Sequence, residues 1–204
     1  GEIYNYLELR RALERRGVVF SSSSDTEVVL HLYAAYGTEM FAQLNGMFAL
    51  ALYDRVDGSL LLARDRLGIK PLYLHRSGPR LLYASEMKAF LFHPDFEAEL
   101  DVERLSEYFL FRYTAGTGSL VRGVSALEPG TYAVFRDGHR RTHSYWSIPR
   151  HRVRVHDLGE AKEQLVSLMQ SSVKYRLISD VPVGCQLSGG IDSSLISRWA
   201  VAEH

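Results

Sequence analysis

Cysteine is almost absent from this chain, which has one, Cys185, among 204 residues. A single cysteine excludes a disulfide framework and a zinc cluster built on cysteines. It also favours a reducing compartment, so we expect a cytoplasmic protein.

Long apolar runs and excess charge are missing as well. Runs such as residues 47–53 fall far short of the ~20 residues that a membrane helix needs. The 24 basic and 24 acidic side chains give a formal net charge of zero. This balance disfavours a nucleic-acid binder that works mainly by electrostatics, and equally a polybasic membrane anchor. We therefore expect no nucleic acid and no membrane among the partners.

The first three quarters of the chain favour antiparallel strands with a few helices. Asn5 is a good N-cap for a helix over residues 6–16, and a second helix should cover residues 26–36. Asp57-Gly58 and Asp137-Gly138 are turn pairs typical of hairpins. The expected strands are 18–20, 47–54, 60–64, 72–75, 81–85, 132–136 and 140–145, with a further helix over 101–111.

The last quarter has a different pattern, which begins after a linker at residues 149–156. A helix to about residue 176 precedes an apolar run, 181–187, that predicts a buried strand. Residues 188–192 form a glycine loop, and a helix follows over 193–204. Helix, strand, loop and helix in this order open an α/β sheet domain. Cys185 would then lie on the buried strand as an inert small hydrophobe.

The glycine loop carries the strongest chemical signal. Glycines let backbone N–H groups approach an anion closely, and the helix N-terminus adds partial positive charge. Asp192 would repel phosphate unless a cation lay between them, so it indicates Mg²⁺ bridging Asp192 and a pyrophosphate. The plainer alternative is an exposed turn that only caps a helix. The hydroxyls available to phosphate oxygens belong to Ser188, Ser193 and Ser194.

The loop resembles the Ser-Gly-Gly-x-Asp-Ser pyrophosphate loop of the adenylating ATP pyrophosphatases. That resemblance implies ATP as a bound substrate, with the main chain of Gln186 lining the adenine pocket. The residues that it assigns to ATP and pyrophosphate are Gln186, Leu187, Ser188, Gly189, Gly190, Asp192, Ser193 and Ser194.

The N-terminal segment resembles the class II glutamine amidotransferases. The matching stretches include Gly1-Glu2-Ile3-Tyr4-Asn5 and Ser24-Asp25-Thr26-Glu27. The resemblance narrows to the glutamine-hydrolysing asparagine synthetases because of residues 64–73, residues 84–89 and the glycine loop. It covers essentially the full chain. This implies a glutaminase domain at 1–148, a linker at 149–156 and the start of a synthetase domain at 157–204.

The resemblance also implies a fold, a site and an activity. The fold would be a two-sheet αββα domain of the N-terminal-nucleophile hydrolase type (α+β), followed by the beginning of a Rossmann-like α/β adenylating domain. Gly1, Glu2 and Asp25 would bind glutamine, with the Gly1 backbone N–H as an oxyanion donor. Two carboxylates suit the α-ammonium of glutamine because charge-assisted hydrogen bonds are strong. Asp25 as a plain helix cap is the alternative.

The implied reaction is glutamine hydrolysis to ammonia, coupled to amidation of aspartate through β-aspartyl-AMP. The partners would be glutamine, aspartate and ATP, and the resemblance suggests a homodimer. The family's N-terminal cysteine nucleophile is not in this sequence, which opens on Gly1. We therefore expect a fragment that is inactive by itself. A β-lactam synthetase, a lasso-peptide cyclase or a catalytically dead paralogue would be alternatives on the same scaffold.

Overall fold

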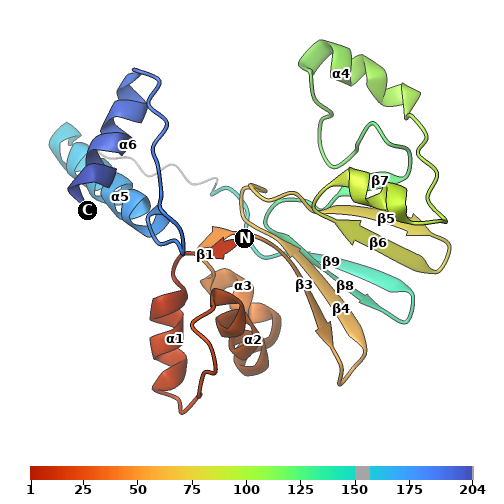
Figure 1. The fold of residues 1–204 in the computed structure, drawn as a ribbon, viewed down its shortest axis with the longest axis horizontal. Coiled ribbons are helices and arrows are strands. Elements are labelled where there is room, and N and C mark those ends of the chain that lie inside the picture. The colour runs from red at the N-terminus through yellow and green to blue at the C-terminus, as the bar shows by residue number, and fades with distance from the viewer. Residues whose placement is uncertain (150–156, 204) are drawn as a thin grey trace.

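The computed structural model describes residues 1–149 and 157–203. Most of the expected linker therefore lies outside the described residues. Figure 1 shows two groups of elements, a large one of strands and helices and a helix pair, α5 and α6.

Within the described residues, the strands form three antiparallel sheets. A two-stranded ribbon pairs β1 with β2, a four-stranded sheet has the order β3-β4-β8-β9, and a three-stranded sheet has the order β6-β5-β7. Their bounds are β1 Glu2–Ile3, β2 Gly46–Met47, β3 Ala49–Asp54, β4 Ser59–Arg64, β5 Tyr73–Ser77, β6 Arg80–Ala84, β7 Val124–Ala126, β8 Thr131–Arg136 and β9 His139–Ser144.

The first helices of the chain pack against the four-stranded sheet, and the last two pack against each other as the separate pair. The α-helices are α1 Tyr6–Glu14, α2 Asp25–Tyr36, α3 Met40–Gln43, α4 Leu105–Phe111, α5 Leu158–Arg176 and α6 Ile191–Ala202. The 3₁₀ turns in the described part of the chain are η1 Gly37–Glu39, η2 Met87–Phe92 and η3 Val102–Arg104.

Alternating side chains of β4 divide the core into layers. Leu61 and Ala63 pack with α1, α2 and α3, whereas Leu62 packs with Leu74 of the three-stranded sheet. Successive side chains of a strand point to opposite faces, so one strand serves two cores. Phe90 of η2 helps to cover the outer face of the second sheet. The result is helices, sheet, sheet and 3₁₀ turns, which confirms the expected layered α+β domain.

The hairpin predictions are confirmed. β3 pairs with β4 and β8 with β9, each antiparallel and across its expected turn pair, and β5 pairs antiparallel with β6. At the last turn Asp137 and Gly138 both have positive φ, 50° and 74°. That combination suits a two-residue turn whose twist matches the strands, and Gly and Asp tolerate it best.

Three local predictions in the N-terminal part are wrong. Residues 18–20 form no strand, because the Val18 N–H bonds to the Leu13 carbonyl at 3.2 Å and closes the end of α1. Asn5 makes no side-chain cap; it bridges the Gln43 carbonyl and the Asn45 N–H, both at 2.9 Å. The expected strand 47–54 is interrupted at Phe48, between β2 and β3.

The buried strand expected over residues 181–187 is also wrong. This segment is exposed, with no assigned strand, and Cys185 is exposed with it. A parallel strand is normally covered on both faces and paired with at least one neighbouring strand. Among the described residues from 157 onward no other strand is available to pair with it. The Rossmann-like part of the fold prediction is therefore represented here by helices α5 and α6 alone.

Candidate functional site

Glu2 is placed by a very close backbone approach between β1 and β2. Glu2 lies opposite Met47, and Ile3 lies opposite Gly46. A Cβ added at Gly46 would lie 2.1 Å from the Glu2 carbonyl oxygen. Only glycine lets the two strands meet at this separation, so Gly46 fixes where the Glu2 backbone runs.

Asp65 fixes the chain immediately after β2. Its carboxylate is buried and accepts hydrogen bonds from the Phe48, Leu67, Ile69 and Lys70 backbone nitrogens, at 2.9–3.2 Å. The Asp65 N–H donates in turn to the Phe48 carbonyl at 2.9 Å. These bonds replace ladder pairing at Phe48, which explains why the strand breaks there. Burial raises the pKa of the nearby Tyr145 hydroxyl, and the charge of Asp65 raises it further.

Asp25 begins α2 and faces β1. Its Oδ2 accepts a hydrogen bond from the Ile3 backbone N–H at 2.9 Å, so the bond joins residues 22 positions apart. The helix cap is a different residue: the Ser24 hydroxyl accepts from the Thr26 N–H at 3.1 Å. The alternative of Asp25 as a plain N-cap is therefore wrong. Its carboxylate instead faces the surface between α2 and β1, where Oδ2 binds Ile3 and Oδ1 accepts from the Thr26 hydroxyl at 3.3 Å.

Glu2 and Asp25 line one polar cavity of about 230 Å³. Its other walls are Tyr6, Ser22, Ser23, Ser24, Ile178, Ser179 and Asp180. The structure thus brings together two of the three residues expected to bind glutamine. The cavity lies below the ~300–1,000 Å³ of a site for a drug-sized ligand, so its occupant would be small and polar. The carboxylates give it a preference for a cation.

Gly1 lines a second, more apolar cavity of about 150 Å³ next to the first. Glu2 and Asp25 border this cavity too, and β3 supplies much of its apolar wall. A Cβ at Gly1 would lie 2.8 Å from the Met47 carbonyl oxygen, so this glycine also permits a close backbone approach. All three expected residues therefore meet at the junction of two adjacent cavities.

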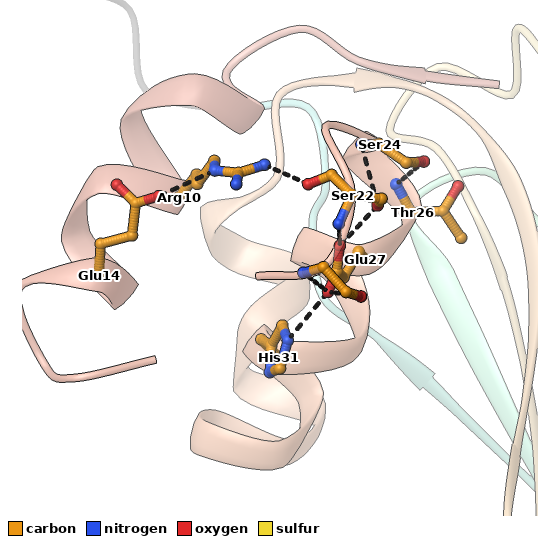
Figure 2. Close-up of polar contacts among 8 residues, drawn as sticks. Arg10, Glu14, Ser22, Ser24, Thr26, Glu27 and His31 are labelled. Atoms are coloured by element: carbon orange, nitrogen blue, oxygen red, sulfur yellow. Dashed lines mark hydrogen bonds and ion pairs between the residues drawn. The ribbon is translucent and has the colours of Figure 1, made fainter. Parts of the chain in front are cut away.

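Glu27 holds the serine wall of the polar cavity, as Figure 2 shows. Its carboxylate accepts from the backbone nitrogens of Ser21 and Ser22, both at 2.7 Å, and from their hydroxyls at 2.8 and 2.5 Å. These bonds, the Ser21 backbone bond foremost, lower the pKa of Glu27 to about 2. From the opposite side, Arg10 Nη1 donates to the Ser22 carbonyl at 2.6 Å.

Sequence reasoning missed this function of Glu27 and Arg10. The sequence pattern marks Glu27 only as part of the Ser24-Asp25-Thr26-Glu27 stretch. A usable signal was present: a glutamate two positions into a capped helix, preceded by four consecutive serines, offers an acceptor beside many free donors.

The glycine loop leads into α6, and its polar side chains lie at or near the protein surface. Gly189 has φ +82°, a conformation that favours glycine. The hydroxyls of Ser188 and Ser193 lie 3.0 Å apart, and Ser193 and Ser194 donate to the Gly190 carbonyl at 3.1 and 2.8 Å. Gln186, Leu187 and Asp192 are exposed beside them. Phosphate would have to replace the bonds that the hydroxyls now make with one another and with Gly190.

Metal and membrane signals are weak in the part of the chain that the structure describes. Residues 1–149 and 157–203 contain no group of three or more His, Cys, Asp or Glu placed to hold a metal ion. Within the same residues, no helix is both long and apolar enough to span a bilayer.

Comparison with known proteins matches both parts of the chain. A family model described as glutamine amidotransferase domain covers residues 1–146, and one described as asparagine synthase covers residues 164–204. The chain is 39% identical over 202 residues to asparagine synthetase [glutamine-hydrolyzing] 3 of Bacillus subtilis, covering 98% of this chain and 33% of that protein. It is also 39% identical over 205 residues to asparagine synthetase [glutamine-hydrolyzing] 1 of the same organism, covering 100% and 32%.

A solved structure supports the fold. The glutamine phosphoribosylpyrophosphate amidotransferase of B. subtilis matches with a TM-score of 0.50 and 18% identity, over 98% of this chain and 42% of that chain. This chain spans about a third of the length of the curated relatives it matches. Because the first family model covers residues 1–146 of 204, the chain belongs to the glutamine amidotransferase domain family.

Proposed function

We propose that this chain belongs to a glutamine-dependent asparagine synthetase, with the amide-donor site in residues 1–148 and the start of the ATP-binding half in residues 157–204. In the intact protein, glutamine would be hydrolysed to glutamate and ammonia. ATP would adenylate the side-chain carboxylate of aspartate and release pyrophosphate. Ammonia would then attack β-aspartyl-AMP, forming asparagine and AMP.

The observation that carries this proposal is the meeting of Glu2 and Asp25 at one polar cavity. The bond from the Ile3 N–H to Asp25 fixes their relative position. Two carboxylates can accept charge-assisted hydrogen bonds from an α-ammonium group, and each such bond contributes more than a neutral one. Gly1 lines the adjoining second cavity, and in the intact protein its backbone N–H would donate toward a developing oxyanion.

The glycine loop supports the second half of the proposal. Ser188, Ser193, Ser194 and the glycines present hydroxyls and N–H groups at the N-terminus of α6, where the helix dipole favours an anion. Gln186 and Leu187 would line the nucleotide site ahead of the loop. The family match over residues 164–204 is consistent with ATP as the ligand.

Asp192 fits Mg²⁺ as a ligand. Its carboxylate is exposed in the first turn of α6, and Mg²⁺ prefers hard oxygen donors supplied by one or two carboxylates plus substrate phosphates. When bound, Mg²⁺ would neutralise charge on the pyrophosphate oxygens. The role of Asp192 would be to hold the metal against the loop, while the serine hydroxyls orient the phosphates.

The experiment is a paired assay of the intact protein. Glutamate release from glutamine and asparagine formation from aspartate and ATP are measured, with glutamine or ammonium chloride as nitrogen source. The proposal predicts asparagine from both sources and AMP plus pyrophosphate as coproducts. Asparagine from ammonium alone, with no glutamate release, would remove the amide-donor assignment; adenylation of a different carboxylic acid would favour the β-lactam synthetase or cyclase alternative. The homodimer stays a proposal on family resemblance, and the cytoplasmic location stays a proposal on the low cysteine content.

A further inference from the structure

Two contacts join the last turn of α5 to the N-terminal part of the chain. The Tyr175 hydroxyl donates to Glu8 Oε1 at 2.8 Å, across 167 positions of sequence. The Arg176 guanidinium carbon lies 5.5 Å from the centroid of the Tyr4 ring. Figure 1 shows this end of α5 next to β1, and Tyr4 directly follows β1 in the sequence. The helix pair is thus attached beside the amide-donor cavity.

Hydrogen bonds within α5 position the Arg176 side chain for this contact. Its Nη1 donates to the Ser172 carbonyl at 3.0 Å and to the Ser172 hydroxyl at 2.7 Å. Tyr4 is buried, so its ring offers a fixed and partly desolvated face. A guanidinium within about 6 Å of such a face is attracted by the ring quadrupole, more strongly where water is excluded.

The end of α5 also positions the segment that follows it. The Leu177 N–H bonds to the carbonyls of Val173 and Lys174, and the Ile178 N–H to that of Tyr175, all at 3.2 Å. Residues 178–180 then form one wall of the polar cavity, which Ser22, Ser23 and Ser24 also line. Asp180 brings a third carboxylate to the cavity that Glu2 and Asp25 border. The wall is therefore carried by the same turn that contacts Tyr4 and Glu8.

We propose that Tyr175 and Arg176 are positioning residues for the amide donor: by attaching α5 to Tyr4 and Glu8, they hold residues 178–180 as one wall of the glutamine cavity. The inference rests on the proposed function of that cavity. The consequence is that glutamine binding depends on the synthetase half, although no synthetase residue takes part in glutamine chemistry. Ammonia, which bypasses the cavity, is unaffected.

The experiment uses the intact protein with the variants Arg176→Met, Arg176→Lys and Tyr175→Phe. Lys162→Met, which removes a charge from an exposed position on the same helix, is the matched control. Arg176→Met should raise the KM for glutamine about 3- to 30-fold, the range that a cation–π contact of this kind supports. Its kcat with glutamine and its KM for ammonium should stay at the wild-type values. Arg176→Lys should recover part of the loss, and Tyr175→Phe should shift KM in the same direction by a smaller factor.

The outcomes separate clearly. A glutamine KM for Arg176→Met equal to that of Lys162→Met would overturn the proposal, as would an equal loss with ammonium, since that indicates a general structural defect. If Arg176→Met does not fold, Tyr175→Phe decides by the same KM comparison. A wild-type protein that releases no glutamate from glutamine would reject the proposed function itself, which is a different result from a wild-type-like Arg176→Met.

Discussion

The carboxylate of Asp25 accepts a hydrogen bond from the backbone nitrogen of Ile3 at 2.9 Å. One end of the bond is the first turn of α2 and the other is β1, so it locks a helix to the strand that carries Glu2. Asp25 therefore contributes to the site in two ways. Its Oδ2 atom holds β1 in position, and its carboxylate adds negative charge to the polar cavity. Because β1 also lies very close to β2, an added side-chain atom at Gly46 would displace the backbone of β1.

Gly46→Ala should damage the site through backbone displacement. The added Cβ would lie 2.1 Å from the Glu2 carbonyl oxygen, a backbone atom that cannot rotate away. Overpacking of this kind costs about 1–3 kcal/mol. We expect a lower thermal midpoint together with a higher KM for glutamine. Gly184→Ala is the control, because a Cβ there meets nothing within 4 Å. Equal midpoints for the two variants would show that β1 tolerates the displacement.

Glu27→Gln should destabilise the protein in a pH-dependent way. The pKa of Glu27 is lowered from 4.5 to about 2, so its charged form contributes stability above pH 4.5 that is lost as the pH falls toward 2. The variant should be less stable than wild type at pH 7, and the difference should shrink below pH 4.5. Urea unfolding at several pH values measures it, with the exposed Glu163→Gln as control. If the difference in unfolding free energy between wild type and Glu27→Gln grew as the pH fell, the hydrogen bonds to the Glu27 carboxylate would not be stabilising.

Asp65→Asn should destabilise the domain at all pH values near neutrality. An amide has one acceptor oxygen, so two of the four backbone N–H groups that Asp65 binds would face an NH₂ group. An unsatisfied buried donor costs about 1–3 kcal/mol. Chemical unfolding of Asp65→Asn is compared with Asp137→Asn, an exposed turn position with positive φ that asparagine tolerates. Equal stability of the two variants would show that Asp65 is not essential to this loop.

Asp192→Asn should impair ATP use while leaving glutamine hydrolysis intact. The exposed carboxylate lies in the first turn of α6, beside the loop serines. Removing its charge should weaken Mg²⁺-dependent ATP use while glutamate release stays close to wild type. ATP–pyrophosphate exchange as a function of Mg²⁺ concentration is the measurement. Exchange identical to that of wild type at every Mg²⁺ concentration would contradict a metal role for Asp192.

The sequence could predict hairpins because their turn residues determine the local backbone conformation. Asp137-Gly138 specifies its hairpin because both residues accept positive φ, and the pairing of β8 with β9 follows from that turn. Glu2 and Asp25 were identified by resemblance to a family, and the structure brings them to one cavity.

Features that depend on distant partners could not be predicted in this way. Asn5 bonds to Gln43 and Asn45, about 40 positions away, instead of capping its own helix. Phe48 leaves its strand because Asp65 binds it. Residues 181–187 have the composition of a strand but no pairing neighbour among the described residues, so hydrophobicity alone does not place them in a sheet.

The central claim is that the charge of Asp25 holds the amide donor, and the Asp25→Asn variant of the intact protein tests it most directly. The amide oxygen of asparagine can still accept from the Ile3 N–H, so the backbone geometry is preserved while the charge is lost. The account predicts a loss of about 1.5–3 kcal/mol in glutamine binding, seen as a raised KM for glutamate release. Asparagine formation from ammonium should stay at the wild-type rate. Equal impairment with glutamine and ammonium, or an unchanged KM for glutamine, would contradict the account.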